Sequence, residues 1–180
     1  MITRWTEATE SDFQGTIIDV ETIGGFRDEY PDSRRYQDHR LVIVGFIEKY
    51  HLEIVCARGD DSIAELVAEA QGLIAGLERP FCAFNSGFER GVFFYNLGMK
   101  ISFERELQRG RESKEKACRQ LTIPHYDDPF FGRGADCMDA WRTGRFDQAV
   151  AHNRACLLKE RDILLKRGFG EPEPLRFVKL

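Results

Sequence analysis

The sequence predicts an α/β fold in which a mixed β-sheet is flanked by helices. Two observations lead to this prediction. Three short β-branched runs come first, and the second and third are close enough to pair as a hairpin. Strand-like and helix-like segments then alternate, which places parallel neighbours beside the antiparallel ones. The 180 residues fit a single domain, spanning 1–180, with room for a stable core.

The strands are expected mainly in the first half of the chain. Thr16–Val20 is a β-branched run, and a charged, turn-rich loop follows over Arg27–His39. Leu41–Glu48 and Leu52–Ala57 have the composition of strands, and the short gap between them predicts an antiparallel hairpin. Phe81–Phe84 is a further short strand of the buried type.

Helices are expected after the hairpin. Asp60-Asp61-Ser62 offers an N-cap to a helix whose apolar residues recur at helical spacing as far as Leu77. A second, apolar helix is predicted over Phe88–Leu97. The stretch Phe103–Leu121 combines many charges with good helix formers, which indicates a solvated helix with internal ion pairs.

The last third of the chain is expected to begin irregularly and to end in a long helix. Pro124–Gly134 lacks periodicity, and Asp136 is expected to cap a short helix that runs through Trp141. Asp147–Arg167 is predicted to be a long helix, and Gly168 is positioned to end it. An extended tail then follows.

Composition narrows the classes of function. The net charge of −4 argues against a large basic surface for duplex DNA. It is compatible with a small groove in which metal ions supply the positive charge. Five cysteines without paired spacing indicate reduced thiols and a cytoplasmic protein. The polar start does not read as a signal peptide, and no apolar run approaches the roughly 18 residues of a membrane span, so no membrane partner is expected.

Two carboxylates follow the first predicted strand. Asp19 and Glu21 are two positions apart, so their side chains share one face of the strand. Two like charges at that place repel one another unless cations lie between them. Carboxylate oxygens are the ligands that Mg²⁺ and Mn²⁺ prefer, so the pair is a candidate metal cradle. The alternative is a strand end that simply reaches solvent.

A second polar group joins the short strand to the apolar helix. Asn85 lies in the turn, and Glu89 lies in the first turn of the helix, where the backbone dipole favours an acid. Glu89 is therefore either a third metal ligand or only a favourable helix start. Asn85 would orient the substrate or the loop.

These residues resemble the motifs of the DEDD-type 3′–5′ exonucleases of the ribonuclease H-like superfamily. Ile17–Thr22 is similar to the first motif, a hydrophobic strand that runs into Asp-x-Glu-Thr. Asn85, Phe88 and Glu89 are similar to the second, in which most members have Asp at the acid. The resemblance implies a ribonuclease H-like mixed sheet and metal ligation by Asp19, Glu21 and Glu89. It also implies substrate contacts from Thr22, Asn85 and Phe88.

The third motif is altered at its acid. In the family a Tyr or His that positions the attacking water precedes the last Asp on a C-terminal helix. His152 resembles that residue here, but Cys156 takes the place of the acid, and a thiol is a poor ligand for a hard cation. Glu160, one helical turn further on, is the first candidate for the missing metal ligand. The alternatives are Asp136 or Asp139, a site that holds only one metal well, and a Glu160 that faces solvent.

The expected function is metal-dependent 3′–5′ exonuclease-like hydrolysis at single-stranded DNA or RNA ends. Asp19, Glu21, Glu89 and Glu160 would hold two Mg²⁺ or Mn²⁺ ions, and His152 would guide the water. The alternative is a catalytically degenerate module that binds nucleic acid or a partner protein without cutting. A third reading is a nuclease that cuts internally. No protein partner is identified.

Overall fold

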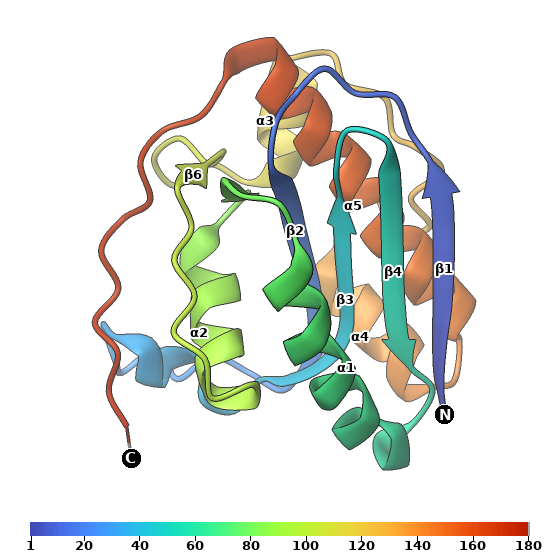
Figure 1. The fold of residues 1–180 in the computed structure, drawn as a ribbon, viewed down its shortest axis with the longest axis vertical. Coiled ribbons are helices and arrows are strands. Elements are labelled where there is room, and N and C mark those ends of the chain that lie inside the picture. Colours follow the sequence, from blue (N-terminus) through green and yellow to red (C-terminus); the bar gives the residue numbers. More distant parts are fainter. Residues whose placement is uncertain (180) are drawn as a thin grey trace.

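A six-stranded mixed sheet forms the centre of the molecule in the computed structural model, which describes residues 1–179 (Figure 1). Its strand order is β1-β4-β3-β2-β5-β6. β1, β4, β3 and β2 pair with one another in antiparallel fashion, whereas β5 and β6 run parallel to β2. The strands are β1 (Ile2–Ala8), β2 (Thr16–Ile23), β3 (Arg40–Ile47), β4 (His51–Ala57), β5 (Phe81–Ala83) and β6 (Arg105–Glu106).

Helices cover both faces of this sheet. α1 and α2 lie in front of the strands in Figure 1, and α4 and α5 lie behind them. α5 packs across β2, β3 and β4, so a single helix spans the middle of the sheet. The helices are α1 (Ile63–Gly76), α2 (Ser86–Asn96), α3 (Lys114–Gln120), α4 (Gly134–Arg142) and α5 (Phe146–Arg167), with short 3₁₀ turns at Ser33–Tyr36 and Asp60–Ser62.

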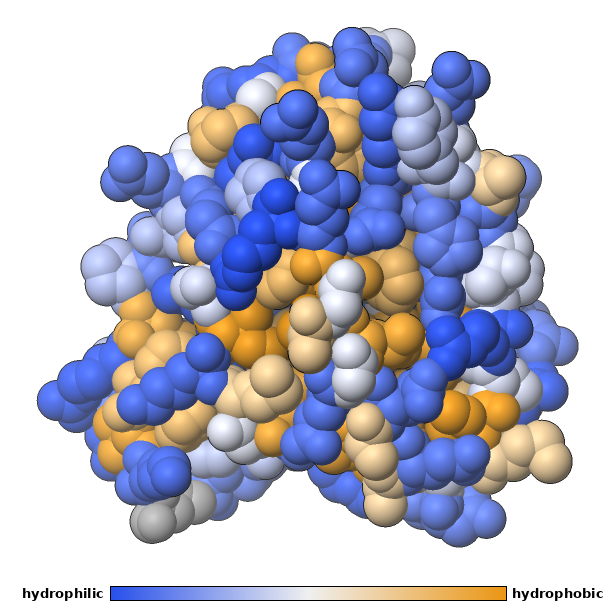
Figure 2. Space-filling view, in the orientation of Figure 1, coloured by the Kyte–Doolittle hydropathy of each residue, from blue (hydrophilic) through white to orange (hydrophobic). Residues whose placement is uncertain are grey.

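The central strands are apolar on both faces because both faces are covered. Every residue of β3 after Arg40 is buried, and so are the first five residues of β2. Gly45 lets α5 pack directly against the backbone of β3, since a Cβ at that position would lie 2.0 Å from the Asn153 side-chain oxygen. On the face seen in Figure 2, apolar residues gather near the centre, with hydrophilic residues around them.

Most predicted elements are present. β3 and β4 form the predicted antiparallel hairpin, and α5 extends the predicted long helix by one residue. Gly168 ends that helix with a φ of 73°, a conformation that glycine adopts without strain. Trp141 is buried, and its ring nitrogen donates to the Ala57 carbonyl oxygen at 2.6 Å, so it anchors α4 to the end of β4.

The first strand is missing from the sequence-based prediction. Ile2–Ala8 pairs with β4 along its full length and forms one edge of the sheet. Its residues alternate between half-buried and exposed, and its charged side chains reach neighbouring elements: Arg4 pairs with Glu53, and Glu7 pairs with Arg154. An edge strand needs only one apolar face, so its polar composition concealed it.

The predicted helix over Phe103–Leu121 is wrong. Its start forms β6, whose Glu106 is bridged to Gly170, and only Lys114–Gln120 is helical. Backbone pairing with β5 outweighs the local preference for a helix, because intrinsic helix preference is weak and tertiary contacts override it. Ser113 caps the short helix by accepting from the Lys116 backbone N–H at 3.2 Å.

Two predicted caps also differ. Asp136 lies within the first turn of α4, after Arg133, and pairs with that arginine at 2.7 Å. The Ser62 side chain does not cap α1; its hydroxyl donates to the Gly59 carbonyl oxygen within a 3₁₀ turn. Within residues 1–179, no helix is both long enough and apolar enough to cross a membrane.

Candidate functional site

A cavity of about 980 Å³ opens where the end of β2 meets α2, α3, α5 and the irregular loop before α4. It collects residues from distant parts of the sequence because the parallel strands β2 and β5 end at the same edge of the sheet. The predicted acids Asp19, Glu21 and Glu89 all line it, as do the predicted His152 and Cys156. The carboxylates at positions 19, 21 and 89 therefore share one site, as the sequence predicts.

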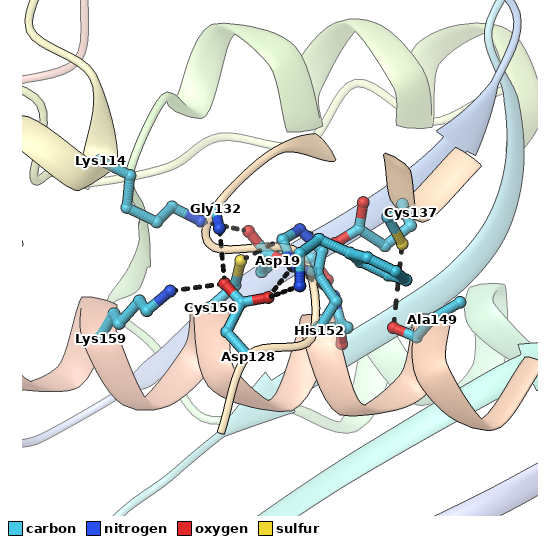
Figure 3. Close-up of polar contacts among 12 residues, drawn as sticks. Asp19, Lys114, Asp128, Gly132, Cys137, Ala149, His152, Cys156 and Lys159 are labelled. Atoms are coloured by element: carbon cyan, nitrogen blue, oxygen red, sulfur yellow. Dashed lines mark hydrogen bonds and ion pairs between the residues drawn. The ribbon is translucent and has the colours of Figure 1, made fainter. Parts of the chain in front are cut away.

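Asp19 is buried at the centre of this site (Figure 3). One of its carboxylate oxygens accepts from the Lys114 ammonium at 2.9 Å, and the other accepts from the Asn153 amide at 2.7 Å. The same ammonium lies 2.5 Å from a carboxylate oxygen of the fully buried Glu160. Glu160 thus lies beside Asp19, and a solvent-facing position for its side chain is excluded.

The other two candidates for the fourth acid lie elsewhere. Asp136 pairs with Arg133, and Asp139 lies 3.9 Å from Arg142 with most of its side chain exposed. Neither lines the cavity. Glu160 does not line the cavity either, but it shares the Lys114 ammonium with Asp19, so it lies at the site and the two aspartates do not.

The acids outnumber the positive charges that face them. Burial raises the pKa of Glu21 to about 7, with Asp19 acting in the same direction. Burial, together with Asp19, also holds the pKa of Glu89 and that of Glu160 well above the ordinary range. Burial acts against the charge on Lys114, but the surrounding acids keep its pKa raised. Burial also acts against the charge on His152, but the surrounding acids raise its pKa to about 11, so its imidazolium faces Glu21 as a second positive charge. Four carboxylates still outnumber these two cations, which fits the raised pKa values of Glu21, Glu89 and Glu160.

Three carboxylate oxygens in this cluster have no hydrogen-bond partner within residues 1–179: Glu89 Oε2 and both oxygens of Glu160, of which Oε1 is ion-paired with Lys114. A buried polar atom without a partner is costly, and such atoms are enriched at sites that bind an ion or a substrate. The unpartnered oxygens and the excess of acids both fit a divalent cation at this position.

His152 is oriented by the carboxylate of Asp128, which has no sequence signal for this role. Its Nδ1 donates to Asp128 Oδ1 at 2.7 Å, and Asp128 also accepts from the Lys159 ammonium at 2.6 Å. Burial acts against ionising Asp128, but the hydrogen bonds from His152 and Lys159 hold its pKa well below the ordinary range. The other imidazole nitrogen, Nε2, lies 3.8 Å from Glu21 Oε1 and 3.7 Å from Cys156 Sγ.

The predicted substrate-contacting residues are placed differently from one another. Asn85 and Phe88 line the cavity, whereas Thr22 does not. The Thr22 hydroxyl is 2.8 Å from His39 Nδ1, because a register shift in β2 between Glu21 and Thr22 turns the strand there. The predicted contact between Thr22 and a substrate therefore lacks a geometric basis.

Four contributors to the site carry no sequence signal for their place in it: Lys114, Asp128, Asn153 and Lys159. Lys114 belongs to the stretch misassigned as a solvated helix, and Asp128 belongs to the loop without periodicity. Asn153 directly follows His152 on α5, and nothing in its spacing indicates its contact with Asp19. A lysine that is buried against acids cannot be told from a surface lysine until the tertiary contacts are known.

Comparisons with family models, curated proteins and solved structures found no match to this chain. The functional argument therefore depends on the geometry and chemistry of the cavity.

Proposed function

We propose that the protein is a divalent-metal-dependent phosphodiesterase with a ribonuclease H-like fold, which removes nucleotides from the 3′ end of single-stranded DNA or RNA. The observation that carries the proposal is the convergence of Asp19 and Glu21 from β2 and Glu89 from α2 at the cavity, with Glu160 from α5 buried beside them against the Lys114 ammonium. The order of antiparallel strands followed by two parallel ones supports the fold assignment.

The donor set suits a hard cation. Asp19, Glu21, Glu89 and Glu160 present oxygen atoms, which are the ligands that Mg²⁺ and Mn²⁺ take. When bound, such ions supply Lewis-acid activation of water and stabilisation of the leaving oxygen. His152 would guide the attacking water, and Asp128 holds its ring in place for this task.

The cavity walls suit a nucleotide. Phe88 and the exposed Phe131 line it, and the His125 ring lies 4.6 Å from the Phe131 ring. Aromatic faces stack on bases without sequence preference. The exposed Arg119 also lines the cavity and can pair with phosphate. These features support a nucleotide end as the substrate, and the five free thiols support a cytoplasmic setting.

Lys114 favours a second candidate function. Its ammonium already pairs with Asp19 and Glu160, at the place where a cation would be bound. A protein that keeps this arrangement would bind a nucleic-acid end in the cavity without cutting it.

The test is digestion of an end-labelled single-stranded oligonucleotide with Mg²⁺ or Mn²⁺ by the parent protein and by Asp19→Asn. The variant should lose at least about 100-fold in the release of mononucleotides, because electrostatic stabilisation of this kind contributes several kcal/mol. Asp139→Asn, an exposed acid outside the cavity, is the matched control and should retain activity. Equal digestion by Asp19→Asn would refute the assignment. Internal products would indicate an endonuclease, and binding without turnover in either metal would support the second candidate.

A further inference from the structure

A compact group of mixed donor atoms lies beside the carboxylate cluster. Glu21, His152 and Cys156 each present one potential metal ligand, and the three atoms lie within 4.8 Å of one another. His152 Nε2 is 3.8 Å from Glu21 Oε1 and 3.7 Å from Cys156 Sγ. This group contains oxygen, nitrogen and sulfur, so it differs from the all-oxygen set that the sequence predicts.

These separations are close to those around a tetrahedral ion. Bonds of about 2.3 Å to sulfur and about 2.0–2.1 Å to nitrogen and oxygen put neighbouring donor atoms about 3.4–3.6 Å apart. The two measured separations exceed this by a few tenths of an ångström. A small change in the torsions of Glu21 would close the remaining gap, and Glu21 is the least buried of the three residues.

The histidine is already held as a metal-binding histidine is held. A ligating imidazole usually donates its other N–H to a carboxylate, which sets the tautomer and the ring orientation. Asp128 accepts from His152 Nδ1 (Figure 3), and this directs Nε2 at Glu21 and Cys156, where a metal ion would take the place of its proton. Asp128 is itself fixed by the backbone N–H groups of Phe130 at 3.0 Å and Gly132 at 2.8 Å.

The chemistry of the group selects the metal. A thiolate and an imidazole favour Zn²⁺ and similar borderline or soft cations, whereas Mg²⁺ prefers oxygen. A carboxylate and a thiolate together balance the charge of a divalent ion, which matters because the group is largely buried. All three residues line the cavity, so a fourth coordination position would face it.

We propose that Glu21, His152 and Cys156 bind a thiophilic divalent cation of the Zn²⁺ class, with Asp128 as the positioning residue for the imidazole. The replacement of an acid by Cys156 then changes the metal that this position selects. The proposal goes beyond the proposed nuclease activity: this ion takes Glu21 and His152 as ligands in place of the roles proposed for them with Mg²⁺ or Mn²⁺. It binds whether or not a phosphodiester is cut.

The test is titration of metal-free protein with Co²⁺, whose absorption reports its ligands. The parent protein should bind one Co²⁺ and show a thiolate-to-cobalt charge-transfer band in the near ultraviolet together with strong tetrahedral bands in the visible. Zn²⁺ should abolish these bands at equimolar concentration, and a large excess of Mg²⁺ should leave them. A protein without the charge-transfer band, or one that loses Co²⁺ to equimolar Mg²⁺, would overturn the proposal.

Cysteine variants identify the sulfur ligand. Cys156→Ser should lose the charge-transfer band, whereas Cys118→Ser should keep it. Cys118 is the matched control because it is another buried thiol that lines the same cavity. Cys137 is not expected to contribute, since its thiol points to the Ala149 carbonyl oxygen at 3.8 Å. Retention of the band in Cys156→Ser would exclude Cys156 as a ligand.

Asp128→Asn tests the positioning role separately. The band should persist, because the three ligands remain, while the affinity for Co²⁺ falls about 10–100-fold. An unchanged affinity would refute that role. None of these optical measurements uses a nucleic acid, so a failure of the nuclease proposal leaves them interpretable, and their failure leaves the digestion assay interpretable.

Discussion

Lys114→Met is the substitution that most directly tests the electrostatics of the site. The Lys114 ammonium lies 2.9 Å from Asp19 Oδ1 and 2.5 Å from Glu160 Oε1, and its side chain is only 20 % exposed. At an effective dielectric constant of about 20, a pair of unit charges about 3 Å apart attracts by about 5–6 kcal/mol. Desolvation offsets much of this attraction, and removing one partner of a buried pair typically costs about 3–5 kcal/mol.

In EDTA the loss of unfolding free energy in Lys114→Met should lie near the lower limit of about 3–5 kcal/mol. Glu160 already has a raised pKa and can take up a proton when the ammonium is removed, which relieves part of the repulsion. A loss of about 3 kcal/mol corresponds to a fall in Tm of about 6–12 °C for a chain of this length. Lys116→Met, on the exposed side of the same short helix, should unfold at the parent temperature.

Mn²⁺ should stabilise Lys114→Met more than it stabilises the parent protein. In the parent protein the ion competes with the ammonium for Asp19 and Glu160, and in Lys114→Met it does not. At 100 times its Kd a ligand adds about 2.7 kcal/mol to the unfolding free energy, so Mn²⁺ should restore most of the lost stability in the variant.

The assay is thermal unfolding followed by circular dichroism across a Mn²⁺ series, with the Lys116→Met protein measured in parallel. The reasoning would be refuted if Lys114→Met unfolded at the parent temperature in EDTA and responded to Mn²⁺ no more than the parent does.

Three further predictions follow from the same geometry. Glu21 carries a pKa of about 7 against an ordinary value of 4.5, so between these values the folded protein holds a proton that the unfolded chain releases. The unfolding free energy of the metal-free protein should therefore fall by about 3 kcal/mol between about pH 5 and 8. Urea unfolding of Glu21→Gln should lack this fall, and a pH dependence equal to that of the parent would contradict the prediction. Gly45→Ala should destabilise the protein by about 1–3 kcal/mol because its Cβ would meet Asn153, whereas Gly72→Ala, with open space around it, should be neutral or stabilising in the same unfolding assay. Cys156→Asp should raise Mg²⁺-dependent nucleotide release in the digestion assay, since the position regains a hard ligand, and a fall in that activity would count against the two-metal reading.

Local patterns in the sequence determine much of this fold. The β-branched runs at 16–20, 41–48 and 52–57 are strands, because apolar residues on both faces are stable only within a covered sheet. The long helix over 147–167 is also present, with glycine at its end. The edge strand β1 and the short β6 were not predicted, because each depends on backbone pairing with a partner far away in the chain.

The sequence by itself placed Asp19, Glu21, Glu89 and His152 as functional candidates, because their order and spacing resemble known motifs; each acid alone also has an ordinary structural explanation. Only the tertiary structure decided which other charges meet them. Whether Lys114 neutralises the acids, whether Glu160 is buried beside Asp19, and whether Asp128 orients His152 all depend on contacts between residues that are 24 to 134 positions apart or that lie in loops without periodicity. Local spacing carries no information on such contacts, because packing of α5 and the irregular loop against the sheet is what brings those groups together.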